Sequence, residues 1–245
     1  MMKNLVCAIP AILIAANCIA QTTDDPFATP IGAGQSAIEV NVVEFATLPG
    51  SHEEPARPML LVDEPGTERL FVNDMRGALY SVSYDGTRVE PYLDHEAAAW
   101  AAGVHGGRGE RGFQSFAFHP QFADAGTPGF GKLYTYIDVT DTAPEADFVS
   151  GGGSDAHDTL LLEWTAENPE AAMYDGGPPR ELLRVEQPFG NHNGGQIGFN
   201  PVASPGDADF GMLYVGSADG GSGGDPMDLS QNLESICFKI LRIDP

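Results

Sequence analysis

The chain has few cysteines. Three occur among 245 residues, and Cys7 and Cys18 lie within the first 20. If that segment is removed, Cys237 remains without a cysteine partner, so no intrachain disulfide can form. The histidines show no paired spacing for zinc, and with one remaining cysteine a structural zinc site is not expected. Within the apolar sequence around it, we expect Cys237 to be a small buried residue.

Basic residues are also scarce. There are 12 Lys and Arg against 35 Asp and Glu, which gives a formal net charge of −23. Nucleic-acid binding depends on clusters of Lys and Arg that neutralise phosphates, and the sequence contains no such cluster. We therefore expect no nucleic-acid partner. The acidity favours solubility or cation binding, and it does not indicate a particular activity.

A long hydrophobic run is missing as well. The apolar stretch at residues 6–16 is shorter than the roughly 20 residues that a membrane-spanning helix needs. With Lys3 before it and small residues at its end, residues 1–20 have the pattern of a secretory signal peptide that is cleaved after Ala20. We therefore expect a secreted or periplasmic protein with no membrane span. A lipid anchor on Cys18 is a less favoured alternative.

The segment after the signal peptide differs from the rest of the chain. Residues 21–36 are rich in Thr, Asp, Pro, Gly and Ala without an apolar period, which predicts a disordered leader. Residues 38–45 alternate between apolar and polar side chains and predict a first strand, which Pro49-Gly50 ends. The folded domain is predicted to cover residues 37–245.

A repeated pattern of short apolar segments follows. In each repeat, an apolar segment leads through a turn to a segment with Leu and an aromatic residue, and a third segment follows after a loop of variable length. The segments are 60–65, 69–72 and 77–82; 116–120, 132–136 and 159–164; and 197–201, 212–215 and 238–243. Short strands in a repeated unit with loop insertions are typical of β-propeller blades.

The predicted fold class is therefore all-β, a β-propeller of four-stranded blades. Leu70, Leu133 and Leu213 occupy equivalent places and are 63 and 80 positions apart, which exceeds the roughly 40–50 residues of compact blades. We assign the excess to insertions at 139–158, 167–179 and 219–228. Short helices are expected only in loops, at 94–102 and 228–233.

About three blades are predicted, whereas a closed propeller needs about four to eight so that no sheet edge is left bare. We therefore expect the chain to be the first half of a longer propeller. A half-propeller that pairs with another half is the alternative.

Two glycine-rich segments match known motifs without the required context. Residues 107–112 fit G-x-G-x-x-G, but this segment precedes a strand expected at 113–118 instead of following one, so nucleotide binding is not expected. Residues 220–224 fit the G-x-S-x-G nucleophile elbow, but no histidine follows Ser222. A flexible glycine loop is the favoured interpretation.

The same loop contains three acidic residues, Asp219, Asp225 and Asp228. Carboxylates and backbone carbonyls freed by glycine are ligands that suit calcium, although the spacing does not match an EF-hand loop. A solvated acidic loop is the favoured interpretation, and a calcium site is the alternative.

The stretch Asn191–Ile197 is the strongest candidate for a site. His192 lies between two asparagines, directly before two glycines and the start of a predicted strand. A neutral imidazole can take a proton from a substrate hydroxyl near neutral pH, and flanking polar groups can fix its tautomer. The alternative is a loop histidine at the start of a strand.

Four segments together resemble a known family. They are Glu110–Pro120, Asn191–Ile197, Ala218–Gly220 and Lys239–Asp244, in that order. From about residue 57 to residue 245, the sequence resembles the N-terminal half of the glucose/sorbosone dehydrogenase family, the soluble quinoprotein sugar dehydrogenases. The resemblance implies a six-bladed propeller.

The resemblance also implies an activity. An aldose sugar would be oxidised at its anomeric hydroxyl, with hydride passing to pyrroloquinoline quinone (PQQ) held by Ca²⁺ and then to an external electron acceptor. His192 matches the family's general base, Asp219 the residue that orients it, and Glu110 a position that contacts the quinone. Well-understood members have Gln there, and a carboxylate beside an anionic cofactor should weaken its binding unless it is protonated or paired with a cation.

Two other functions remain as alternatives. Glu110-Arg111-Gly112 also resembles the hedgehog-interacting relatives of this family, in which the propeller is a binding module for a partner. A non-catalytic propeller that binds a glycan or a protein is therefore the second hypothesis. The third is another propeller chemistry, such as lactone hydrolysis with calcium and His192.

Overall fold

The computed structural model describes residues 41–50, 54–97, 99–100, 102–106, 109–140, 142, 144–154 and 157–245. Glu44–Pro245 forms one unit and Met1–Val43 another, of which residues 41–43 are described. The predicted signal peptide and leader lie outside the described residues. Residues 41–45 form no strand, which corrects the prediction there. Val42 and Val43 are exposed, so the alternating pattern faces no apolar surface.

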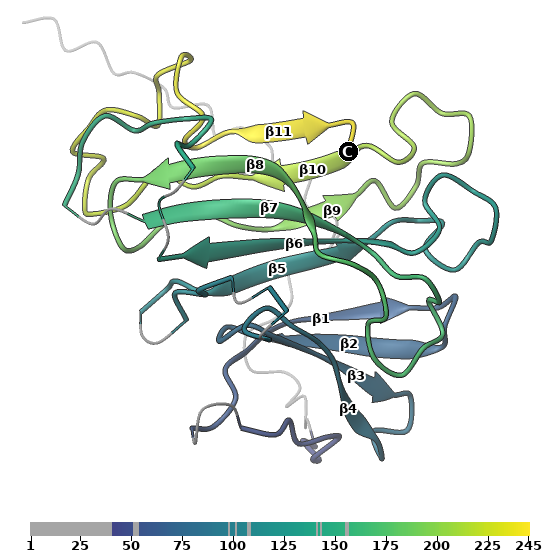
Figure 1. Cartoon of the computed structure of the whole chain (residues 1–245). Coiled ribbons are helices and arrows are strands. Elements are labelled where there is room, and N and C mark those ends of the chain that lie inside the picture. Colours follow the sequence, from purple (N-terminus) through teal and green to yellow (C-terminus); the bar gives the residue numbers. More distant parts are fainter. Residues whose placement is uncertain are drawn as a thin grey trace, which may run out of the picture. The chain divides into compact units, whose positions relative to one another are not determined.

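The described residues of the unit Glu44–Pro245 form three antiparallel sheets, and in each of them strands adjacent in sequence pair (Figure 1). The first sheet contains β1 (Pro58–Glu64), β2 (Arg69–Asp74), β3 (Ala78–Ser83) and β4 (Val89–Asp94). The second contains β5 (Phe113–Phe118), β6 (Lys132–Val139), β7 (His157–Thr165) and β8 (Arg180–Gln187). The third contains β9 (Ile197–Phe199), β10 (Leu213–Gly216) and β11 (Ile240–Ile243). This arrangement confirms the predicted all-β class and a partial β-propeller.

The strands missing from the repeated sequence pattern are β4 and β8, the outermost strands of the first two sheets. Both contain charged residues, and β4 also contains Pro91. Neither strand therefore forms the apolar run by which the other strands were predicted. The last predicted segment also starts too early. Phe238 has a φ of 58° in the left-handed region, and β11 therefore begins at Ile240.

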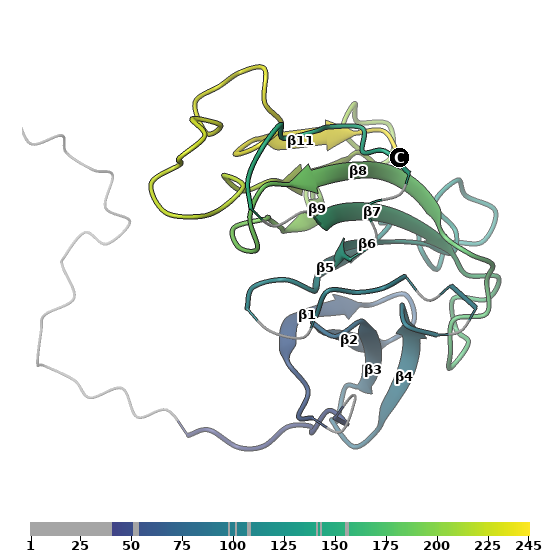
Figure 2. The ribbon, with the colours of Figure 1, turned by 60° about the vertical axis from the view of Figure 1, so that its left-hand side comes forward.

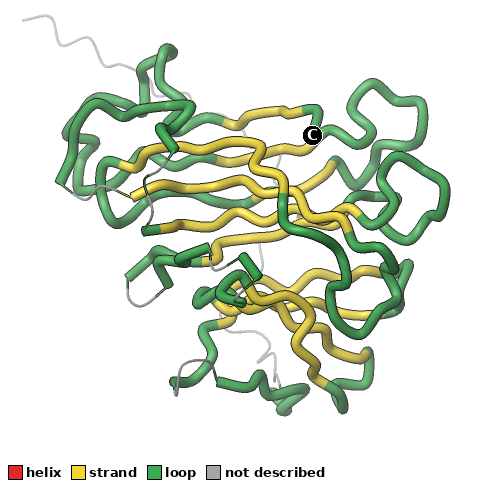
Figure 3. Tube along the Cα trace, in the orientation of Figure 1, coloured by secondary structure: helices red, strands yellow, loops and turns green. Residues whose placement is uncertain are grey.

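The described residues contain strands and loops but no helix (Figure 3). The helices expected at 94–102 and 228–233 are therefore wrong within the described part of those segments. Turns occupy the described part of the segment where the first helix was expected. Ala97 N–H donates to the Asp94 carbonyl at 3.1 Å, and His95 N–H donates to the Gly77 carbonyl, outside the segment, also at 3.1 Å. Across the described segments, no helix is long and apolar enough to cross a membrane.

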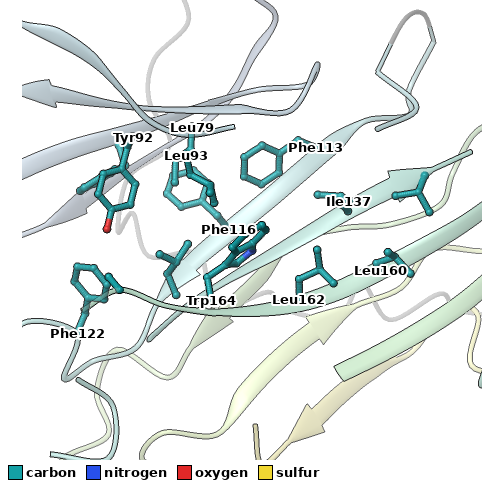
Figure 4. Packing of buried hydrophobic residues seen from close by; sticks show 14 residues of the cluster. Leu79, Tyr92, Leu93, Phe113, Phe116, Phe122, Ile137, Leu160, Leu162 and Trp164 are labelled. Carbon is teal, nitrogen blue, oxygen red and sulfur yellow. The ribbon is translucent and has the colours of Figure 1, made fainter. Parts of the chain in front are cut away.

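The sheets meet through their first strands, since β5 contacts both β1 and β9 (Figure 2). A core cluster joins the first two sheets. Figure 4 shows its buried side chains, among them Leu79, Tyr92 and Leu93 from the first sheet and Phe113, Phe116 and Trp164 from the second. Burying each large apolar side chain stabilises the fold by about 1.5–3 kcal/mol. A smaller cluster that includes Leu161, Ile197 and Leu213 joins the second and third sheets.

A chain of buried hydrogen bonds crosses from the second sheet to the first. Trp164 Nε1 donates to Thr135 Oγ1 at 2.9 Å, and Thr135 Oγ1 lies 3.0 Å from His95 Nε2. His95 Nδ1 lies 2.6 Å from the Gly77 carbonyl. Because a carbonyl only accepts, His95 is the Nδ1–H tautomer and Thr135 donates to its Nε2. Burial lowers the pKa of His95 to about 4, so the ring is neutral.

A second link positions the segment before β9. Ser115 on β5 donates its hydroxyl proton to the Gly195 carbonyl, and its oxygen accepts from Ile197 N–H at 3.1 Å. One hydroxyl therefore bonds on both sides of Gln196, where the chain enters the third sheet. The residues just before Gly195, which include His192, are thus attached to the rigid second sheet.

Candidate functional site

His192 lies in the loop between β8 and β9 and has a φ of 52°. A non-glycine residue in this left-handed region costs roughly 1–2 kcal/mol, so surrounding contacts must hold it there. The C=O of His192 accepts from Gly220 N–H at 3.1 Å. The conformation is therefore fixed partly by the loop after β10.

Three predicted residues meet at this point. His192 Nδ1 lies 3.1 Å from Asp219 Oδ1, and His192 N–H donates to Glu110 Oε2 at 3.0 Å. Glu110 precedes β5, His192 precedes β9, and Asp219 follows β10. The structure thus brings together, from three separate segments, the three residues that the family resemblance selected.

The His192–Asp219 contact leaves one ring nitrogen available. A carboxylate at Nδ1 favours the tautomer with its proton on that nitrogen, so the lone pair is on Nε2. No described residue forms a hydrogen bond to Nε2. The imidazole is 44% exposed and the Asp219 side chain 26%, so a solute can reach the ring. A base held by an orienting carboxylate is the arrangement that proton abstraction needs.

The glycines of the Asp219 loop are positions of close approach. Gly221 N–H donates to Asp219 Oδ1 at 3.0 Å. Gly221 has a φ of 104°, and a Cβ placed there would lie 2.3 Å from the Asn191 carbonyl oxygen. Ser222 N–H also donates to Asn191 Oδ1 at 2.9 Å. Residues 219–222 are thus packed against the His192 segment, in contrast to the flexible loop expected there.

Gly195 gives a prediction with a matched control. A Cβ on Gly195 would lie 2.7 Å from Tyr136 Cδ1, whereas a Cβ on Gly198 in β9 would meet nothing within 4 Å. Gly195→Ala should therefore lower the free energy of unfolding by about 1–3 kcal/mol through overpacking. Gly198→Ala should change it far less. Urea unfolding of both variants checks this, and equal effects would show that contact with Tyr136 is not the cause.

Several residues around the site were missed by the sequence prediction. Asn193 is buried, and its Nδ2 donates to Gln187 Oε1 at 3.1 Å and to the Phe189 carbonyl at 2.8 Å. Gln114 Nε2 donates to the Glu110 carbonyl and, at 2.7 Å, to Asp138 Oδ2. Asn193 was visible as a flanking amide. Nothing in the sequence pairs Gln114 with Asp138.

The other acidic residues of the loop do not join Asp219. Asp225 accepts from Leu229 N–H and Ser230 N–H, both at 2.9 Å, and these bonds, led by that of Ser230, lower its pKa. No group of three or more His, Cys, Asp or Glu side chains in the described residues is arranged to hold a metal ion. Asp219, Asp225 and Asp228 therefore do not form such a group, and calcium binding by this loop stays an alternative for experiment to test.

Cys237 is buried, as the sequence predicted, and burial raises the pKa of its thiol. The G-x-G-x-x-G match at 107–112 lies partly outside the described residues. Its described part precedes β5, which confirms the predicted order of that segment and the strand.

No protein-family model matches the chain. In sequence, it is 31% identical over 153 residues to the HIPL1 protein of Arabidopsis thaliana, a match that covers 55% of this chain and 21% of that protein. It is 31% identical over 183 residues to the Hedgehog-interacting protein of Homo sapiens, covering 73% of this chain and 23% of that protein. The chain thus spans about a fifth of the length of these relatives.

Two solved structures share the fold. One is the glucose dehydrogenase-type oxidoreductase of Thermus thermophilus, with a TM-score of 0.51, 24% identity, and coverage of 76% of this chain and 43% of that one. Another glucose dehydrogenase has a TM-score of 0.52, 16% identity, and coverage of 77% and 47%. At these identities the likeness concerns the propeller fold alone.

Proposed function

We propose that this chain carries the proton-accepting part of a sugar dehydrogenase site, in which His192 takes the proton of an aldose's anomeric hydroxyl. The observation that supports it is the 3.1 Å contact between His192 Nδ1 and Asp219 Oδ1, with Nε2 open to solutes. The sugar substrate is suggested by the glucose dehydrogenases that share the fold.

The chain's own residues account for the proton. Nε2 of neutral His192 accepts the hydroxyl proton, and the imidazolium that results is stabilised by the Asp219 carboxylate at Nδ1. Asp219 also keeps the ring from rotating, because its Oδ1 is held by Gly221 N–H. Oxidation of the sugar further requires that the hydride at the anomeric carbon leave to an acceptor. PQQ with Ca²⁺ is the acceptor that the family resemblance implies.

The described residues do not by themselves fit an anionic quinone. Two of the three side chains at the site are carboxylates, and Glu110 Oε2 is already used by the N–H of His192. A quinone that carries carboxylates would be repelled unless a cation such as Ca²⁺ lay between them. The proton transfer assigned to His192 therefore involves no step on the cofactor.

A binding module is the second candidate function. It is favoured by the similarity to the Hedgehog-interacting protein, which extends over 73% of this chain. The carboxylate of Glu110 also favours it, because it does not suit an anionic cofactor. In that case the site would contact a glycan or a protein partner without chemistry.

One experiment separates the two candidates. The full-length protein is incubated with PQQ and Ca²⁺, passed through gel filtration, and assayed for dye reduction by a panel of aldoses, with a chelator-treated sample as the control. The dehydrogenase proposal predicts retained quinone absorbance together with sugar-dependent dye reduction, whereas the binding-module proposal predicts neither. If neither is seen, the dehydrogenase proposal fails, and calorimetric titration with the same sugars then tests binding without turnover.

A further inference from the structure

Glu110 lies in a loop that the first sheet holds firmly. Arg57, just before β1, donates from Nη1 to the Gly106 carbonyl at 3.0 Å and from Nη2 to the Gly109 carbonyl at 2.6 Å. At the other end of the loop, a Cβ on Gly112 would lie 2.1 Å from the Met75 carbonyl oxygen. The described backbone on both sides of Glu110 is therefore fixed against the first sheet.

The second sheet holds Glu110 as well. Gln114 on β5 donates to the Glu110 carbonyl, and the same amide nitrogen donates to Asp138 Oδ2 at 2.7 Å. Asp138 is buried on β6, and it also accepts from Gly112 N–H at 3.1 Å and from Thr159 Oγ1 at 2.6 Å. A buried carboxylate with three donors is a rigid support, because breaking any of these bonds leaves a buried polar group unpaired.

The carboxylate of Glu110 is directed at a backbone group. Its Oε2 accepts from His192 N–H at 3.0 Å. His192 is the residue with the left-handed φ of 52°, whose imidazole contacts Asp219. A hydrogen bond from N–H to a carboxylate is stronger than one to a neutral acceptor, so it can offset the cost of this conformation.

We propose that Glu110 is a positioning residue that holds the backbone of His192 in the conformation that presents its imidazole to Asp219. This differs from the cofactor contact that the family resemblance implies for this position. The role of His192 as a base rests on the proposed function, whereas the contact between Glu110 and the His192 backbone does not.

The proposal distinguishes two substitutions at the same place. Glutamine has the length of glutamate and a carbonyl oxygen that can accept the same N–H, whereas alanine has no acceptor. Glu110→Gln should therefore retain the conformation and Glu110→Ala should lose it. Glu90→Ala, at an exposed position on β4, removes one negative charge outside the loop that contains Glu110 and is the control for net charge.

The first measurement is the rate of amide hydrogen exchange at His192. It is monitored by NMR in the absence of any cofactor. Glu110→Ala should speed exchange of the His192 N–H by about 10- to 100-fold, the effect of losing a hydrogen bond to a charged group. Exchange in Glu110→Gln should stay within a few-fold of the wild type, and Glu90→Ala should not change it. Unchanged exchange in a folded Glu110→Ala variant would overturn the proposal.

The second measurement is turnover. Glu110→Ala should lower kcat by about 10- to 100-fold with little change in KM, because the base is displaced but substrate contacts remain. Glu110→Gln should restore most of kcat. If Glu110→Gln is as inactive as Glu110→Ala although its His192 amide stays protected, Glu110 acts on the cofactor or substrate and the proposal is wrong. If His192 N–H exchange is faster in Glu110→Ala but the wild-type protein oxidises no sugar, the positioning role of Glu110 is supported and the dehydrogenase proposal is rejected.

Discussion

Replacing His192 by alanine should, under the proposed dehydrogenase function, lower the rate of sugar oxidation by about 10²- to 10⁴-fold, the usual contribution of a general base. The imidazole is half exposed and does not belong to either core cluster, so the fold should tolerate its removal. Loss of kcat without loss of stability is the pattern expected when the group removed acts on the substrate. Dye-coupled assays at saturating sugar measure it.

The controls for His192→Ala come from the same region. Asp219→Asn should also lower kcat, since an amide at Nδ1 neither fixes the tautomer as well nor stabilises the imidazolium. Asp228→Asn changes an exposed carboxylate in the loop that follows Asp219 and should leave the rate unchanged. Whatever PQQ the wild-type protein retains on gel filtration, all three variants should retain the same amount. A His192→Ala protein with wild-type kcat would remove the histidine from the reaction.

The other large effect concerns His95, which should make the protein lose about 3 kcal/mol of stability as the pH falls from about 6.5 to about 4. Burial lowers the pKa of His95 to about 4 in the folded protein, whereas a histidine in the unfolded chain titrates near 6.5. Between these values the unfolded state binds more protons than the folded state. The contribution is therefore fully present above pH 6.5 and is lost progressively as the pH falls.

Urea unfolding at pH 7 and pH 5 tests this. His95→Gln removes the titrating ring, so the drop in unfolding free energy between these pH values should be about 2 kcal/mol smaller in the variant than in the wild type. The difference between the two drops in unfolding free energy isolates the contribution of His95, because the contribution of the carboxylates that titrate in both proteins cancels. His119, which is half buried at another place, stays intact in both. Identical drops would show that His95 is protonated without cost, contrary to its buried hydrogen bonds.

The sequence predicted the strands that carry apolar side chains inward. The predicted Leu-aromatic segments coincide with β2, β6 and β10. They could be found because Leu70, Leu133 and Leu213 recur at equivalent places in the repeat. The outer strands β4 and β8 were not predicted, since one face of each is polar and the alternation is weak. The expected helix at 94–102 failed because His95 turns into the core, which an alanine-rich pattern cannot show.

The sequence predicted which residues belong to the candidate site, but it did not predict which atoms of these residues are in contact. His192 and Asp219 stand out as a histidine beside glycines and an acid after a strand, and the structure places them in contact. The hydrogen-bond partner of the Glu110 carboxylate is a backbone N–H. A contact with the backbone cannot be predicted from the type of residue that provides it. Gln114 and Asp138 were likewise hidden, because their bond joins neighbouring strands at positions that the repeat pattern treats as ordinary.

The outer edges of the first two sheets carry features that oppose pairing with another chain. Pro91 cannot donate a hydrogen bond from β4, and β8 contains two arginines and two glutamates. Both features keep an exposed strand from serving as a template for aggregation. The net charge of −23 adds mutual repulsion between molecules, so colloidal stability should decline as added salt screens that charge.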